Sequence, residues 1–377
     1  MRRKIKWIVT VIIMLAFVIL GKMIPSEELT VRSMAVGLGI DVTEDNKYIV
    51  TAQILSSNGS QTMGNGTRVV RGQGESLTDA LQKITEITSK TLTVTHCNVL
   101  VLGKSVFINN AFEYVIYMLI KSTYLSDSIY VFGYDGNTYD VFSQKTAFGD
   151  NASLYVQGLV SQHGTMNDIS YQMLSQCAVG YYSKSGINWM PYLKKVPVAS
   201  KIPSSDEFEE VKDTDDYVFD LTSIVMLKKG KIAGIFDKNG TKAVNYITSK
   251  VEKGSEEFTL TDKKIGYYVN DSDIKLEFDE KKMAVDARLT LFTTVKSIMV
   301  TNGDGYPLGT SASEGEIKEC AKILQTRIYD FYQKLKENNL DAFNFQQGFF
   351  AKDGIDREDF NLNKVEFNLS VDIKVEK

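Results

Sequence analysis

The pattern of apolar and polar positions predicts a run of strands and helices that starts after the first 24 residues. Residues 33–42 and 47–55 are expected to be strands, because apolar side chains alternate along them and the turn-favouring residues TEDN lie between them. A third strand is expected at 67–74, followed by a helix at 76–90. One apolar stripe runs along this helix, formed by Leu77, Ala80, Leu81, Ile84 and Ile87.

The next segment continues the alternation of strands and helices. It predicts a strand at 97–103, an amphipathic helix at 106–124 and a strand at 128–134. The order β-β-β-α-β-α-β indicates strands packed against two helices in one layered unit. Beyond it, apolar residues three and four positions apart predict helices, most clearly at 151–162 and 166–176.

A second globular unit is predicted in the remainder of the chain. Residues 221–237 favour a hairpin that turns near Lys229 and Gly230, followed by a short helix at 242–250. Strands at 273–278 and 283–295 are joined by the turn DEKK. The strongest helical stripe of the chain comes next and ends near 338–339; it consists of Ile317, Cys320, Ala321, Leu324, Ile328, Phe331 and Leu335. Strict alternation at 364–375 predicts a last strand with one buried face.

These patterns indicate the α+β class: a membrane anchor followed by two or three mixed α/β lobes, with largely antiparallel sheets flanked by helices. The best linker lies at 206–216, where seven acidic residues and one lysine show no apolar period. The predicted organisation is an anchor at 1–24, an N-terminal α+β region at 25–200 (two lobes, 25–135 and 136–200, are an alternative), an acidic linker at 201–216 and a C-terminal α+β domain at 217–377.

The first 24 residues predict a signal anchor. An apolar run from Trp7 to Leu20 follows a basic head, and it reaches the lower limit for a membrane-spanning helix if Lys22 extends to the lipid headgroups. No pair of small residues suited to cleavage lies near Gly21. The first cysteine, Cys97, is too distant for lipidation. An uncleaved anchor is therefore favoured over a cleaved or lipidated N-terminus, with the head in the cytoplasm and the rest exported.

Charge and cysteine content narrow the class of protein. The chain carries 43 basic and 47 acidic residues, and five of the basic ones lie in 1–22, which holds no acidic residue. The exported part therefore has 38 basic and 47 acidic residues, a net charge of −9, which argues against a nucleic-acid partner. Three cysteines, Cys97, Cys177 and Cys320, are too few and too scattered for a disulfide framework and are expected to be buried thiols.

A glycine-containing turn is the first candidate for chemistry. The stretch VVRGQGESLTDAL joins a strand to a helix whose Ser76 and Asp79 resemble a capping box, which is the outline of a phosphate cradle. The third glycine of the dinucleotide fingerprint and the Gly-Lys-Ser/Thr of a P-loop are absent from this stretch. A glycine turn into a helix capped by Ser76 explains the same residues and is the favoured interpretation.

The other candidates are also explained without chemistry. His96 and Cys97 open a strand, and the only other histidine is His163, so a catalytic dyad or a zinc site has few possible members. The loop 301–316 has acids that do not follow calcium-binding spacing. Asp271 and Asp273 are expected in a solvated polar turn. No residues can be assigned the roles of nucleophile, base and oxyanion donor. We therefore expect no catalytic, cofactor, metal or lipidation site, and a protein that is not an enzyme.

Three stretches of the N-terminal half carry a resemblance to a known family. AVGLGIDVTEDNKYIVTAQIL, GQGESLTDALQKI and HCNVLVLGKSV resemble the spore-germination C subunits, the Ger(x)C family that includes the GerAC-like proteins. In the C-terminal half, LTSIVMLKKGKIAGIFD and the long helix before LDAFNFQQGF are similar to the same family, as is the last strand. The likeness covers nearly all of the chain after Pro25, and it depends on the order of the pieces.

The resemblance implies a membrane-anchored subunit of a nutrient germinant receptor in a sporulating Gram-positive bacterium. It implies mixed α/β lobes, two integral-membrane partner subunits of the A and B type, and a location at the spore inner membrane. Family members typically carry a lipid-bearing cysteine soon after the apolar run, whereas this chain has LGKMIPSEEL there. The alternatives are a module that binds a solute for a transporter, a paralogue no longer used in germination, and an exported hydrolase.

Overall fold

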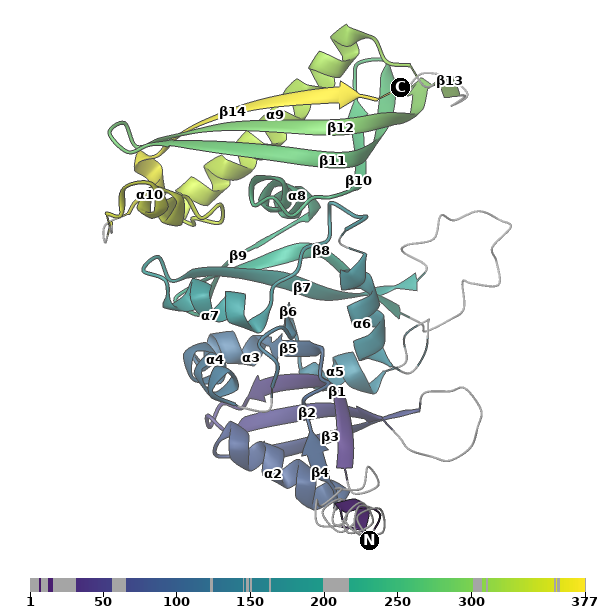
Figure 1. Ribbon diagram of the computed structural model, residues 1–377, viewed down its shortest axis with the longest axis vertical. Helices are drawn as coiled ribbons and strands as arrows, with labels where there is room; N and C mark the ends of the chain where they lie inside the picture. The colour runs from purple at the N-terminus through teal and green to yellow at the C-terminus, as the bar shows by residue number, and fades with distance from the viewer. Residues whose placement is uncertain are drawn as a thin grey trace.

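The computed structural model describes most of the chain after Val31. The described residues are 32–55, 66–122, 125–144, 151–162, 164–198, 217–300, 307–309, 311–355 and 360–376, with the separate positions 7, 13–15, 146, 149 and 357. Within these residues the molecule is elongated, with the elements nearest the N-terminus at one end and the C-terminal strand at the other (Figure 1).

Nine strands of the described residues form the first sheet. They are β1 (Arg32–Val42), β2 (Tyr48–Leu55), β3 (Thr67–Gly74), β4 (Thr91–Thr93), β5 (Val99–Gly103), β6 (Tyr130–Tyr134), β7 (Ile187–Pro197), β8 (Tyr217–Lys228) and β9 (Lys231–Phe236). Their order is β3-β2-β1-β5-β6-β7-β8-β9, with β4 paired to β1. The centre, β1-β5-β6-β7, is parallel, and both flanks are antiparallel.

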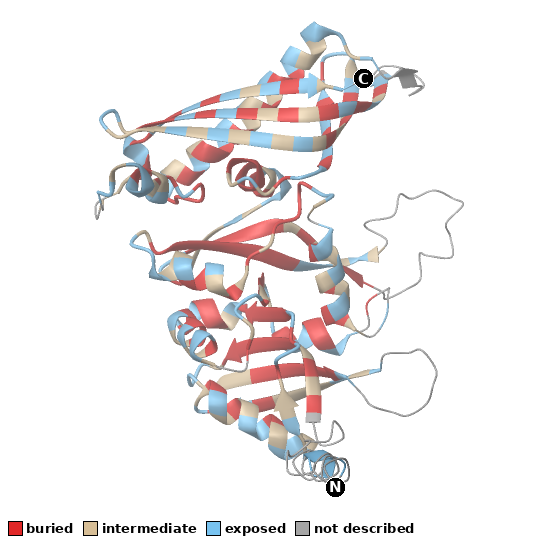
Figure 2. Ribbon diagram, viewed as in Figure 1, coloured by how far each residue is buried: buried red, intermediate tan, exposed pale blue. Residues whose placement is uncertain are grey.

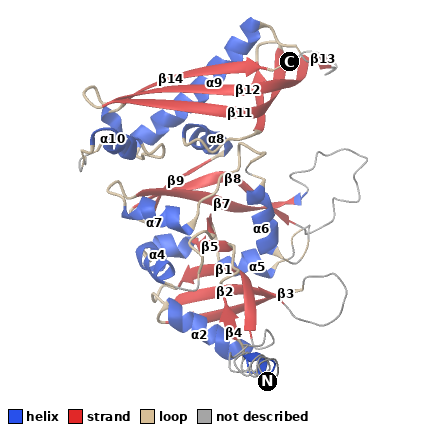
Figure 3. Cartoon of the chain, in the orientation of Figure 1, coloured by secondary structure: helices blue, strands red, loops and turns tan. Residues whose placement is uncertain are grey.

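Helices cover both faces of this sheet, as Figure 3 shows. One face packs against α2 (Leu77–Thr88), α3 (Lys104–Ile108), α4 (Phe112–Lys121) and α7 (Leu174–Tyr182). The other face packs against α5 (Thr138–Ser143) and α6 (Ala152–Ser161). Strand β5 shows why the sheet is covered twice: Leu100 and Leu102 belong to the first core, whereas Val99 and Val101 belong to the second. Such a strand reads as a continuous apolar run, as VLVLG does.

The second sheet has five strands among the described residues. They are β10 (Gly254–Thr259), β11 (Lys263–Asp279), β12 (Ala284–Val300), β13 (Pro307–Gly309) and β14 (Glu366–Val375). β11 and β12 form a long antiparallel hairpin, and β14 adds in parallel to β12. One face is covered by α8 (Lys238–Ile247), α9 (Glu314–Glu337) and α10 (Phe345–Asp353). Figure 2 shows buried residues alternating with exposed ones along these strands.

Most of the expected elements are present, and the α+β class with antiparallel-rich sheets flanked by helices is confirmed. The helix expected at 106–124 was wrong as one element: α3 and α4 are separated at Asn110, which has a φ of 55°. Asparagine adopts this left-handed conformation more easily than most residues, so the chain can turn there. Residues 166–172 were expected to be helical and are not; they form a buried loop that leads to α7.

Several elements were not expected from the sequence. These are β4, β7, β10, β13, η4 (Leu362–Lys364) and α10. Asp271 and Asp273 were expected in a polar turn, and both lie instead on β11 with exposed side chains. The long β11–β12 hairpin explains the error, because its outer face is polar and therefore resembles a loop in sequence.

The thiols and the domain boundary can be compared with their predictions. Cys97, Cys177 and Cys320 are free and buried, as expected, and burial raises the pKa of the Cys97 and Cys177 thiols to about 12.

The predicted linker at 201–216 lies outside the described residues, and the division of the chain into 25–200 and 217–377 remains a prediction. The two predicted regions share one sheet. Strand β7, before the linker, pairs with β8, after it, from Ile187 opposite Lys228 to Pro197 opposite Tyr217.

The segment predicted as an anchor falls mostly outside the described residues. Trp7 and residues 13–15 are helical, and each of these four side chains is more than half exposed. Within the part of the chain that the structure describes, no helix combines the length and the apolar character needed to cross a membrane.

Candidate functional site

Helix α8 lies at the junction between the two sheets (Figure 1). Its inner side packs on the second sheet and α9, and its other side meets the end of the first sheet. Ile187, Trp189, Ile224 and Met226 of β7 and β8 belong to the same apolar core as Val244 of α8. The two halves of the chain therefore share one core at this point. We take this junction as the candidate functional site, because it carries most of the unusual buried polar groups.

A buried loop of the N-terminal half is held by side chains of the C-terminal half. Asn245 of α8 donates hydrogen bonds to the carbonyl oxygens of Asn167 and Ile169, at 3.0 and 2.9 Å. Lys250, just after α8, donates to the carbonyl oxygen of Tyr171 at 2.8 Å. We call residues 167–171 the clamped loop. Its backbone would otherwise have to be buried without partners, which is costly.

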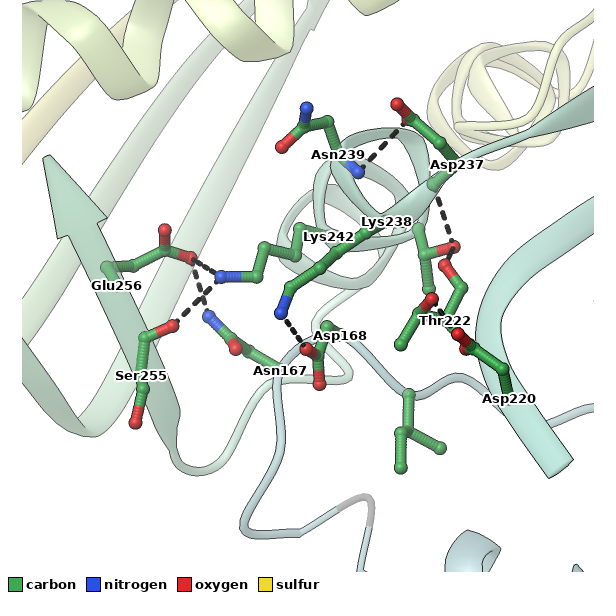
Figure 4. A network of polar contacts seen from close by, with 12 residues as sticks. Asn167, Asp168, Asp220, Thr222, Asp237, Lys238, Asn239, Lys242, Ser255 and Glu256 are labelled. Atoms are coloured by element: carbon green, nitrogen blue, oxygen red, sulfur yellow. Dashed lines mark hydrogen bonds and ion pairs between the residues drawn. The ribbon is translucent and has the colours of Figure 1, made fainter. Parts of the chain in front are cut away.

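Glu256 is the centre of the polar network at the junction (Figure 4). Its carboxylate accepts hydrogen bonds from Asn167 Nδ2 at 2.6 Å, Lys242 Nζ at 2.9 Å and the Tyr246 hydroxyl at 2.9 Å. The Glu256 side chain is only 1% exposed and that of Lys242 13%. Arg327 of α9 lies 3.7 Å from the other carboxylate oxygen. One buried acid thus connects the clamped loop, α8, β10 and α9.

The electrostatics of this network keep Tyr246 protonated. Burial and the neighbouring Glu256 carboxylate raise the pKa of Tyr246 well above its ordinary value, so its hydroxyl remains a hydrogen-bond donor. A second ion pair joins Lys238 of α8 to Asp168 of the clamped loop at 2.6 Å. This arrangement is suited to holding two parts of a protein in one orientation, because its buried carboxylates are paired with cations of the other elements.

A cleft of about 640 Å³ lies on the same junction. Its wall in the N-terminal half comes from α7 and β7, including Gln176, Asn188 and Trp189, and its other wall comes from the segment 341–350. The Lys250 ammonium reaches the cleft, 4.2 Å from the centre of the Trp189 ring and 4.6 Å from that of Tyr171. Burial lowers the pKa of Lys250 to about 8.

Asp341 is the buried acid of this cleft. Its carboxylate accepts hydrogen bonds from the backbone amides of Phe345 and Gln346, both at 2.8 Å, at the start of α10. Burial outweighs these bonds and raises the pKa of Asp341 to about 6. Its two oxygen atoms are used to fix α10 against the end of α9.

The glycine turn has a packing role in the structure. A Cβ atom on Gly72 would lie 2.0 Å from the carbonyl oxygen of Ala80, and one on Gly74 would lie 2.6 Å from the Ala80 nitrogen, so α2 can approach β3 only over glycine. Ser76 caps the helix by accepting from the Asp79 amide at 3.1 Å, and the Asp79 carboxylate accepts from the Glu75 amide at 3.0 Å. Close packing therefore accounts for both glycines, and the amides of Glu75 and Asp79 are already bound, which supports the interpretation as a turn into a capped helix.

The remaining candidate residues are not brought together. His96 is exposed in a turn and Cys97 is buried beside it. His163 lies outside the described residues, as do 301–306 and 310 of the loop 301–316. The described end of that loop caps α9, where Glu316 accepts from the Ser313 amide at 2.7 Å. Among the residues that the structure describes, no group of three or more His, Cys, Asp or Glu is placed to hold a metal ion.

Sequence reasoning missed the residues of the junction. Trp189 lies in β7, whose apolar run from Ile187 to Leu193 is a signal for a buried strand that was available in the sequence. Glu256 shares the buried face of β10 with Phe258, so an alternating pattern placed an acid at an inward position. No local signal pointed to Asn245 or Lys250, because their partners lie 76 or more residues away in the chain.

Comparisons with known proteins agree with this architecture. The family description "Spore germination protein N-terminal domain" matches residues 25–195, and "Spore germination B3/GerAC like, C-terminal" matches residues 222–377. A solved structure, "Crystal Structure of the GerBC protein", has the same fold with a TM-score of 0.53 and 15% sequence identity, over 90% of this chain and 97% of the other. A search of curated protein sequences finds no match. The chain therefore belongs to the Ger(x)C family of spore germination proteins.

Proposed function

We propose that this protein is a non-enzymatic C subunit of a spore nutrient germinant receptor and acts by contact with two integral-membrane subunits. The observation that carries the proposal is the match of both family regions, in order, over residues 25–195 and 222–377. The acidic exported part and the firmly held junction support it, since both suit a body that presents a fixed surface to other proteins.

Residues 1–24 complete the proposal as an uncleaved anchor in the spore inner membrane. An anchor confines the exported part to the membrane surface, so that it meets its partners at a high effective concentration. A weak interface then suffices for assembly. The described residues of this segment, Trp7 and 13–15, are helical, with exposed side chains of which three are apolar aliphatic and one is tryptophan.

A germination assay on three strains tests the proposal. Deleting the gene should slow or abolish germination in response to a nutrient, and restoring the full chain should rescue it. A strain that exports residues 25–377 behind a cleavable signal should respond nearly as poorly as the deletion strain, even when the free protein is abundant. The control is the same exported part joined to an unrelated single-spanning anchor, which should restore the response.

Co-purification completes the test. The full chain should recover two multi-spanning membrane proteins, and the form without an anchor should recover less of them. Normal germination in the deletion strain, with no membrane protein recovered, would contradict the receptor role and favour a paralogue that is not used in germination.

A further inference from the structure

The cleft at the junction has the size and position of a ligand site. Pockets that hold small molecules in proteins usually measure about 300–1,000 Å³ and often lie between domains. This cleft measures about 640 Å³, and its walls come from both halves of the chain. A molecule bound there would touch α7 and β7 on one side and the start of α10 on the other.

The cleft contains a half-buried cation, the Lys250 ammonium. Among the described residues, Lys250 forms no ion pair, and its one hydrogen bond goes to the neutral carbonyl oxygen of Tyr171. Asp341 is the acidic residue among those that line the cleft, and its carboxylate already accepts two backbone hydrogen bonds. An ammonium group has three donors, so Lys250 retains donors for a further partner. An anionic group entering the cleft would supply it.

Three large apolar side chains are exposed at the mouth of the cleft, among polar ones such as Ser183 and Lys184. Val179, Tyr182 and Phe350 line it and are 66%, 55% and 49% exposed. Large apolar side chains that border a pocket while exposed to water favour a ligand with an apolar body. Gln176 and Gln347, which are exposed, also line the cleft and offer their amide groups as further hydrogen-bonding groups.

We propose that this cleft binds a small organic carboxylate, with the carboxylate on the Lys250 ammonium and the apolar body against Val179, Tyr182 and Phe350. Binding in this cleft goes beyond the proposed contact with membrane partners and can be measured without them. Because both halves of the chain line it, an occupied cleft would add contacts across the junction. The proposal concerns binding alone and includes no chemical step.

Tryptophan fluorescence reports on the site directly. The chain has two tryptophans, Trp7 and Trp189, so the full-length variant Trp7→Phe leaves only the one beside Lys250. Titration with phenylacetate should change its emission in a saturable way. Phenylacetamide, which has the same shape and no charge, should bind at least about tenfold more weakly, as expected for the loss of a charge-assisted hydrogen bond. Inorganic phosphate should bind weakly as well, because it lacks the apolar body.

Matched variants assign the effect to the cleft. In the Trp7→Phe chain, Lys250→Met should weaken phenylacetate binding by about tenfold or more. The control Lys253→Met, at an exposed lysine three residues away, should leave the affinity unchanged. Val179→Asp places a carboxylate at the exposed mouth and should weaken binding by repulsion without disturbing the core, so the test holds even if Lys250→Met fails to fold.

Three results would overturn the proposal. One is the absence of a saturable change with phenylacetate. Another is equal affinity for phenylacetamide, which would leave Lys250 without a role. The third is unchanged affinity in a folded Lys250→Met or in Val179→Asp.

Discussion

At the residue scale, the junction depends on the partners of one buried carboxylate. Moving a charge out of water costs several kcal/mol, and only close hydrogen bonds and an opposite charge recover this cost. Glu256 has three hydrogen-bond donors, from Asn167, Lys242 and Tyr246, that come from the clamped loop and from α8. Removing Glu256 therefore leaves both a buried cation and a loop without their partner.

We predict that Glu256→Ala lowers the free energy of unfolding by about 3 kcal/mol or more, because Lys242 stays buried without its anion. Glu256→Gln should fall between this variant and the parent, since its amide can still accept a hydrogen bond. Urea unfolding of residues 25–377 measures the loss. The control is the neighbouring Glu257→Ala: its side chain is 67% exposed and pairs loosely with Lys264, so the change should stay below about 0.5 kcal/mol. Equal losses at 256 and 257 would contradict the role of the network.

At the element scale, the contact of α2 with β3 shows what a glycine turn can mean. The strand, the glycines and the capped helix were predicted from the sequence, and all are present. The sequence could not decide between an anion site and close packing, because both need glycine at the same positions. The structure assigns the first glycine to packing, because a Cβ atom at position 72 would overlap the carbonyl oxygen of Ala80.

We predict that Gly72→Ala destabilises the protein by about 2 kcal/mol or more, because the added methyl group meets rigid helix backbone and α2 must move off β3. Gly315→Ala is the matched control: it lies exposed in the first turn of α9 with open space around it, and it should be neutral or stabilising by up to about 1 kcal/mol. Thermal and urea unfolding of both variants check this. A neutral Gly72→Ala would show that the α2 contact contributes little.

Other elements show why periodicity succeeds or fails. Helix α9 was predicted with its buried face because one side faces the core along its whole length: Cys320, Leu324, Ile328, Phe331 and Leu335 are buried. The prediction of a helix at the clamped loop was wrong for the opposite reason. The loop is mostly buried without regular structure, so the spacing of Met166, Ile169 and Met173, three and four residues apart, imitated a helix. The cleft could not be predicted at all, since Lys250 and Trp189 meet only through the tertiary fold.

At the scale of the whole molecule, the first sheet runs across the predicted acidic linker. The strand before it, β7, and the strand after it, β8, pair along their length, and the two halves also share the apolar core around α8. The halves are therefore held together by strand pairing and by a shared core as well as by the linker, and the linker is not required to keep them together.

We predict that limited proteolysis first cuts residues 25–377 between 204 and 216, where the sequence has charge and no apolar period. The two fragments should elute together from a sizing column without denaturant, because the β7–β8 pairing and the clamped loop still join them. The same nicked sample should separate in urea, which serves as the control. A first cut within 317–338, or fragments that part under native conditions, would show that the boundary is misplaced or the junction weak.

The pairing of β7 with β8 also limits the order in which the chain can fold as it emerges from the ribosome. An N-terminal region that ends near residue 200 has eleven residues of β7 with one unpaired edge, and such an edge invites association with another copy. Its native partner arrives only with β8, and the hairpin is complete at Phe236. The region matched at 25–195 therefore acquires its final edge from the region matched at 222–377, and neither is a finished unit of folding without the other.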